Sequence, residues 1–74
     1  MEPDIEIDAI GLLCPLPVLR LRKRLQALQP GQTARLLASD RMALIDVPHF
    51  CAEEGHTLLA STDADRLSFL VQKG

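Results

Sequence analysis

The chain has 74 residues, of which 47% are hydrophobic, and its formal net charge at pH 7 is −2. This length predicts one small domain over residues 1–74, and the slight acidity argues against general binding to membranes or nucleic acids. No apolar run is long enough to cross a bilayer, and the N-terminal residues lack a signal-peptide pattern. Two cysteines are too few for a disulfide framework, so we expect a cytoplasmic protein with reduced thiols.

The first half of the chain has the pattern of a strand, a helix and a second strand. Apolar and acidic residues alternate over residues 5–9, which predicts a strand with one buried face. Residues 34–38 are a short apolar run, which predicts a central strand. Between them lies a predicted helix that Pro30-Gly31 ends, and its apolar face comprises Val18, Leu21, Leu25 and Leu28.

A second helix is predicted between Asp40, which can cap its start, and Gly55, which ends it. Pro48 interrupts the apolar pattern of this segment, because proline removes a helical hydrogen bond. Two interpretations are open. The segment is either one helix kinked at Pro48, or a turn near residues 42–45 followed by a helix that Asp46 caps.

Residues 57–61 and 67–71 are predicted strands around a hairpin loop, 62–65, that lacks the favoured Asn-Gly signal. The order of elements is therefore β-α-β-α-β-β. Right-handed parallel crossovers place both helices on one side of the sheet, and the last hairpin adds an antiparallel strand. We expect an α+β fold, a two-layer α/β sandwich with a four-stranded mixed sheet and two helices on one face.

Cys14 is the most informative residue, because it stands between the first strand and a helix that opens with prolines. The free N–H groups and the positive dipole end of a helix start favour negative charge, so a thiolate there has a depressed pKa. The thiolate is the nucleophilic form of cysteine. The sequence therefore predicts a reactive sulfur at the carboxyl end of the first strand, where ligands commonly meet open α/β sheets.

The neighbours of Cys14 make this geometry more specific. If Cys14 is the N-cap, Pro15 is the first helical residue and Pro17 lies in the first turn, where neither has to donate a hydrogen bond. Leu16 N–H is then the expected donor to the Cys14 sulfur, since Pro17 has no N–H. Gly11 supplies a position for positive φ, so that the chain can turn sharply from strand to helix.

Two segments resemble a known family. Residues 8–17 contain the order Gly-x-x-Cys-Pro-x-Pro between a strand and a helix, which resembles the signature of the TusA/SirA-like sulfur-carrier (sulfurtransferase) family. Residues 46–51 are similar to the family's Asp-x-Pro-x-Phe-Cys segment. Residues 29–31 and Asp40 also match, so the resemblance covers essentially the whole chain.

The resemblance implies the same sandwich fold and a cysteine that carries sulfane sulfur as a persulfide, which here is Cys14. The implied partners are a sulfur-donor protein of the cysteine desulfurase or rhodanese type and a sulfur-acceptor protein, without a cofactor. The chain departs from the family at Arg41, where many members have proline, and at His49, where a small residue is common. Both departures leave the Cys14 motif intact but bear on which protein docks nearby.

A carrier fits these residues better than a complete enzyme does. A persulfide sulfur is passed on by attack of a thiolate, which requires an exposed, activated cysteine and little else. Enzymatic nucleophilic catalysis usually requires a base that a third group holds, and the sequence does not place His49 or His56 near Cys14. We expect the partner proteins to supply the remaining chemistry, and whether the chain counts as a sulfurtransferase enzyme stays open.

Both cysteines have structural alternatives. Cys14 could be a small buried side chain, as free cysteines often are. Cys51 shares an apolar face with Phe50 and lacks a helix N-terminus, so we interpret it as structural. A redox pair of the two cysteines has no support in the sequence. A zinc site built from them and the histidines fits no common ligand spacing.

Asp8 and a basic stretch complete the candidate site. Asp8 ends the first strand, and we expect it to brace the loop by accepting hydrogen bonds from backbone N–H groups. The alternative is a catalytic acid, although a nearby carboxylate would raise the thiol pKa. Arg20, Lys23 and Arg24 share one side of the first helix, and two interpretations are open: an ordinary solvated face, or a docking surface for an acidic partner.

Two other classes of function stay open. One is a binding or regulatory module in which Cys14 only caps the helix. The other is an RNA-binding domain, although the chain lacks Tyr and Trp for base stacking. The final acceptor is not identified either, because tRNA thiolation, molybdenum-cofactor biosynthesis and oxidative sulfur metabolism all fit a generic carrier.

Overall fold

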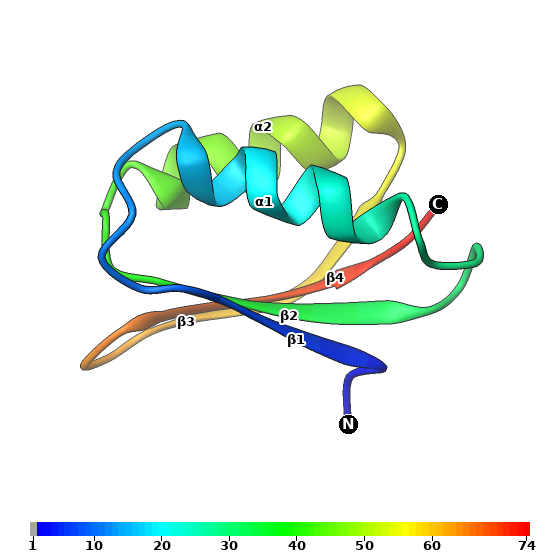
Figure 1. The fold of residues 1–74 in the computed structure, drawn as a ribbon, viewed down its shortest axis with the longest axis horizontal. Helices are drawn as coiled ribbons and strands as arrows, with labels where there is room; N and C mark the ends of the chain where they lie inside the picture. The colour runs from blue at the N-terminus through cyan, green and yellow to red at the C-terminus, as the bar shows by residue number, and fades with distance from the viewer. Residues whose placement is uncertain (1) are drawn as a thin grey trace.

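Six elements follow one another in the predicted order in the computed structural model, which describes residues 2–74 (Figure 1). They form a two-layer α+β sandwich, in which a four-stranded sheet carries both helices on one face. The fold class predicted from the sequence is therefore confirmed. The elements are β1 (Ile5–Ala9), α1 (Leu16–Leu25), β2 (Thr33–Ala38), α2 (Ala43–Glu54), β3 (Thr57–Asp63) and β4 (Leu67–Gln72).

The sheet has the strand order β1-β2-β4-β3 and is mixed. β1 pairs with β2 in parallel, with Ile7 opposite Leu36, and β4 is antiparallel to both β2 and β3. β2 is thus internal, as predicted. Because α1 and α2 return the chain across the same face, the carboxyl ends of β1 and β2 lie at the same end of the molecule as the starts of both helices (Figure 1).

The core lies between the helices and the sheet and is mainly aliphatic. The alternation in β1 buries Ile7 and Ala9, while Leu21 and Leu25 of α1 face the sheet. Burying one such aliphatic side chain contributes about 1.5–3 kcal/mol. Val18 of α1 also packs against the buried residues, which include Ala34, Leu36, Ala38, Val47, Phe50, Phe69 and Val71. The helix ends at Leu25, earlier than the predicted stop at Pro30-Gly31, so Leu28 packs against the core from the turn that follows the helix.

The start of α1 differs from the prediction in one residue. Its N-cap is Pro15 rather than Cys14, Pro17 lies in the first turn, and no side chain caps the helix. Leu16 N–H donates to Leu13 O at 2.9 Å and not to the Cys14 sulfur. The physical reason is that a carbonyl oxygen is a much stronger acceptor than sulfur, and the tight turn brings one within reach.

The second helix, α2, is continuous from Ala43 to Glu54 with Pro48 inside it. The interpretation of a separate helix capped by Asp46 is therefore wrong, and Asp46 lies in the first turn of the single helix. Asp40 precedes the helix and accepts a hydrogen bond from Met42 N–H at 3.0 Å. This bond satisfies one of the N–H groups that a helix start leaves free.

The C-terminal hairpin is longer than predicted. Gly55 ends α2 in a left-handed conformation with φ +78°, as expected. β3 then continues to Asp63, which pairs with Leu67, so the turn shortens to residues 64–66. The register of β3 shifts between Leu58 and Ala60, which leaves an irregularity in this edge strand. Neither helix of the described residues is long and apolar enough to cross a membrane.

Candidate functional site

Cys14 is exposed on the loop that joins β1 to α1. Gly11 makes the turn in this loop with φ +84°, a conformation that other residues rarely adopt. Asp8 accepts a hydrogen bond from Ile10 N–H through Oδ1 at 2.9 Å, so it braces the loop as predicted. The sulfur therefore lies at the carboxyl end of β1, on a loop whose path is fixed by local hydrogen bonds.

A second loop, between β2 and α2, accepts hydrogen bonds from the loop that contains Cys14. Gly11 N–H donates to Ser39 Oγ at 2.8 Å, and Cys14 N–H donates to Asp40 Oδ2 at 2.8 Å. The carboxylate of Asp40 thus joins the cysteine backbone to the start of α2, where it also binds Met42 N–H. These two bonds lower the pKa of Asp40 below its ordinary value.

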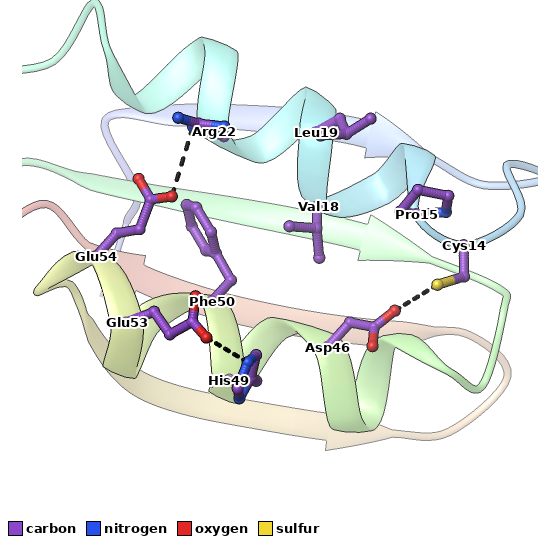
Figure 2. Close-up of a pocket in the computed structure, with 10 residues that line it drawn as sticks. All are labelled: Cys14, Pro15, Val18, Leu19, Arg22, Asp46, His49, Phe50, Glu53 and Glu54. Carbon is purple, nitrogen blue, oxygen red and sulfur yellow. Dashed lines mark hydrogen bonds and ion pairs between the residues drawn. The ribbon is translucent and has the colours of Figure 1, made fainter.

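The side chain of Cys14 points to α2 and donates a hydrogen bond to Asp46 Oδ2 at 2.5 Å (Figure 2). This bond raises the pKa of the Cys14 thiol above its ordinary value, and reduced hydration and the charges of Asp46 and Asp40 act in the same direction. A carboxylate that accepts a hydrogen bond from the S–H group stabilises the neutral thiol. The depressed pKa predicted from the helix start is therefore wrong for the protein without a partner.

A groove of about 310 Å³ extends from Cys14 between α1 and α2 (Figure 2). Two polar contacts line it: His49 Nε2 lies 2.6 Å from Glu53 Oε1, and Arg22 forms an ion pair with Glu54 at 3.5 Å at the end away from the sulfur. The rest of the lining is mostly apolar and comprises Pro15, Val18, Leu19 and Phe50 beside Cys14 and Asp46.

Large apolar side chains are exposed on the two loops and on the first turns of the helices that follow them. Leu13 is 70% exposed and Ile45 is 65% exposed. Contiguous exposed apolar side chains are typical of protein interaction sites. We call this set the apolar rim, and it comprises Ile10, Leu13, Leu16, Leu19, Met42 and Ile45.

The basic residues of α1 have different surroundings. Arg20 donates from Nη1 to the carbonyl oxygen of Asp8 at 2.9 Å, so it ties α1 to the end of β1. Lys23 lines a second groove beside Leu16 and Leu19, and Arg24 is exposed. Of the predicted docking residues, Arg20 thus has a structural contact, while Lys23 and Arg24 lie on the surface.

The other cysteine and the histidines separate into different regions. Cys51 is only 3% exposed and belongs to the core, and burial raises the pKa of its thiol. His56 packs against Phe50 and accepts a hydrogen bond from Gly74 N–H at 3.0 Å. Only His49 shares the groove with Cys14. Within residues 2–74, no group of three His, Cys, Asp or Glu side chains is arranged to hold a metal ion.

Sequence reasoning missed the two carboxylates that contact Cys14. The sequence predicts helix caps at Asp40 and Asp46 and matches both to the family, but it gives no sign that they contact Cys14. They lie 26 and 32 residues from Cys14, and the β1-α1-β2 crossover brings them to its loop. The available signal was that both belong to the segments that resemble the sulfur-carrier family.

The sandwich and its loop-borne cysteine define a fold already seen in a solved protein. The crystal structure of a SirA-like protein from Desulfitobacterium hafniense matches with a TM-score of 0.82 and covers 95% of this chain and 97% of that chain. The two sequences are 23% identical, so this likeness shows the shared fold.

A family model described as Sulfurtransferase TusA matches residues 5–73. The chain therefore belongs to the TusA sulfurtransferase family, and its role in general is that of a sulfur carrier that works with other proteins.

Proposed function

We propose that this protein accepts sulfane sulfur on Cys14 Sγ as a persulfide and relays it between two proteins. The exposure of Cys14 carries the proposal: this thiol opens into a groove at the carboxyl end of β1, whereas Cys51 is buried in the core. The donor is a protein of the cysteine desulfurase or rhodanese type, and the acceptor is a second protein that presents its own thiolate.

The transfer needs no external oxidant or reductant. The Cys14 thiolate attacks the terminal sulfur of the donor's persulfide, a new S–S bond forms at Sγ, and the donor's thiolate leaves. In the second step, an acceptor thiolate attacks the terminal sulfur on Cys14, and the Cys14 thiolate leaves. One sulfur atom moves in each step, and the number of S–S bonds stays constant.

The apolar rim supports docking of these proteins around the sulfur. The rim residues come from the Cys14 loop, the loop between β2 and α2, and the first turns of the two helices, so a partner that covers them can exclude water from both thiols. Hydrogen bonds to Ser39 and Asp40 fix the loop, so the sulfur is presented without a large ordering cost.

The proposal is tested by loading the protein with a small sulfane-sulfur donor such as inorganic polysulfide. Intact mass should show a gain of one sulfur atom, and digestion without reductant should place it on Cys14. Cys14→Ser should abolish the gain. The matched control is Cys51→Ala, which keeps a small apolar side chain in the core and should load normally.

Transfer is then followed from a purified cysteine desulfurase with cysteine as substrate. Loading of wild type and of Cys51→Ala, but not of Cys14→Ser, supports the relay. A sulfur atom that stays on the chain in Cys14→Ser and disappears in Cys51→Ala would reverse the assignment of the carrier residue.

A further inference from the structure

The contact between Cys14 and Asp46 has a chemical consequence that a passive carrier does not require. Asp46 Oδ2 accepts a hydrogen bond from the Cys14 S–H group, and the structure shows no other hydrogen bond or ion pair of this carboxylate within residues 2–74. Of the two forms of cysteine, the neutral thiol is a much poorer nucleophile than the thiolate. The protein without a partner therefore holds its carrier sulfur in the less reactive form.

The charged side chains near the sulfur do not neutralise the negative charge of the Asp46 carboxylate. The loop before α2 contributes Asp40, whose oxygens bind backbone N–H groups. The remaining groups line the groove as two pairs, Arg22 of α1 with Glu54, and His49 with Glu53. The end of the groove at the thiol is thus acidic. Arg22 pairs with Glu54, and Arg41, which follows Asp40 in the chain, pairs with Asp63 at 2.7 Å.

Building on the sulfur-carrier function above, we propose that Asp46 makes Cys14 selective for a partner that presents a cationic group within an apolar face. The cation pairs with the Asp46 carboxylate and withdraws it from the thiol, which can then ionise and attack. The occupant of the apolar rim is accordingly a protein surface with a Lys or Arg side chain near its own reactive cysteine.

No proton is gained or lost in this step. The Cys14 thiol and a donor persulfide anion give a Cys14 persulfide anion and the donor thiol, so the proton of Cys14 ends on the leaving donor sulfur. The partner's cation offsets the repulsion between the new persulfide anion and the Asp46 carboxylate. When the donor leaves, this repulsion returns and favours passing the sulfur onward.

The apolar rim strengthens the selectivity. Leu13, Leu16 and Ile45 exclude water when a partner covers them, and an ion pair that is partly removed from water is stronger than one at an open surface. A partner with an acidic group at the same place would meet the Asp46 carboxylate in the same drier environment. Charge complementarity of this kind selects partners by penalising the wrong charge.

The experiment uses two methanethiosulfonate reagents that share one reactive group and differ in charge, one with a trimethylammonium group and one with a sulfonate group. Both convert a thiolate into a mixed disulfide and release methanesulfinate. Their rates with Cys14 are measured at one pH and low salt, and the modified residue is located by mass.

Each rate is divided by the rate of the same reagent with a small free thiol, because a thiolate is itself an anion and favours the cationic reagent. On this normalised scale, the cationic reagent should react about tenfold faster with wild type than the anionic one, because each meets the Asp46 charge at close range. Asp46→Asn should reduce this ratio to about twofold and should raise the rate with the anionic reagent. The matched control is Glu6→Gln, which removes the same charge on the sheet face away from the helices and should keep the wild-type ratio.

Equal normalised rates with both reagents in wild type would overturn the proposal, and so would a charge preference that stays at the wild-type level in Asp46→Asn. The wild-type comparison needs no variant, so it stands even if Asp46→Asn is poorly folded by circular dichroism. A normal charge preference without any polysulfide loading would instead reject the carrier function and leave the selectivity of Cys14 intact.

Discussion

Two features of the structure act on the Cys14 thiol in opposite directions. The start of α1 offers about half a positive elementary charge, which favours the thiolate. The Asp46 carboxylate carries a full negative charge in hydrogen-bond contact with Sγ, and the first free N–H of α1, on Leu16, is already bound to Leu13 O. The carboxylate is closer and more highly charged, so it decides the direction of the pKa shift.

The pH dependence of alkylation tests this balance. Because the pKa of the Cys14 thiol is raised, the rate with iodoacetamide should reach half of its maximum above pH 9.0, the ordinary value. Raising the pH through that point converts the Cys14 thiol to the thiolate. In Asp46→Asn the midpoint should fall, since the amide carries no charge. A midpoint at or below pH 9.0 in wild type would contradict the contact seen here.

Asp40 should make the stability of the protein depend on pH at the acid end. Its folded pKa is depressed below 3.8 by the N–H groups of Cys14 and Met42, so the ionised form stabilises the fold. That contribution is present above about pH 3.8 and is lost as the pH falls through the folded pKa. Asp40→Asn should lower Tm near neutral pH, and the difference from wild type should shrink below pH 3.8.

The matched control for that measurement is Glu6→Gln. Its Tm difference from wild type should not show the change below pH 3.8 that is expected for Asp40→Asn. A Tm difference for Asp40→Asn that is equal at neutral and strongly acid pH would show that the carboxylate charge does not stabilise the loop.

At the scale of elements, Gly11 decides how β1 leads into α1. A methyl group added there would meet no atom within 4 Å, so the cost of Gly11→Ala comes from its φ of +84° alone. We expect a loss of about 1–2 kcal/mol in the free energy of unfolding, measured by urea titration. The reactivity of Cys14 should change as well, because the same turn positions the sulfur.

Gly31 provides the control, since it has φ +93° and equally open surroundings but lies between α1 and β2. Gly31→Ala should cost a similar free energy while leaving the alkylation rate of Cys14 unchanged. If both variants alter that rate equally, the effect belongs to the fold as a whole and not to the Gly11 turn.

The elements that the sequence predicted best are those with a periodic pattern. Alternation predicted β1, and one apolar helical face predicted α1, because each pattern follows directly from burial against the same core. The ends were less accurate: β3 and β4 extend into polar residues, where backbone pairing is joined by the Arg41–Asp63 ion pair and by a hydrogen bond from Gln72 to Gly31 O. The contact of Cys14 with Asp46 was beyond sequence reasoning, since it depends on where the β1-α1-β2 crossover brings separate loops.

At the scale of the whole molecule, the basic side of α1 and the acidic end of the groove lie around one reactive sulfur. Arg20 is occupied by the Asp8 carbonyl, so the docking surface that we propose on α1 is reduced to Lys23 and Arg24. A partner suited to both regions has an acidic patch over α1 and a cationic group over Asp46. Such charges at the rim of an interface act mainly on the rate of association.

The double variant Lys23→Glu/Arg24→Glu should therefore slow sulfur transfer from a cysteine desulfurase about tenfold at low salt and much less at high salt. Loading by inorganic polysulfide should be unchanged, because it involves no docking. The control is Arg66→Glu, a reversal on the β3–β4 turn. Equal losses with both sulfur donors would assign the two residues to the fold, and no loss with either would assign them to an ordinary solvated face.

The register shift in β3 affects how the molecule behaves among copies of itself. β3 is an edge strand, and a regular edge exposes a row of N–H and C=O groups to which another strand can add. The irregularity at Leu58 and Ala60 interrupts that row, and the acidic side chains of Glu6 and Asp8 lie on the opposite edge strand, β1. Both edge strands of the sheet are thus poor templates for the addition of another strand. This limits aggregation of a carrier whose docking surface is apolar.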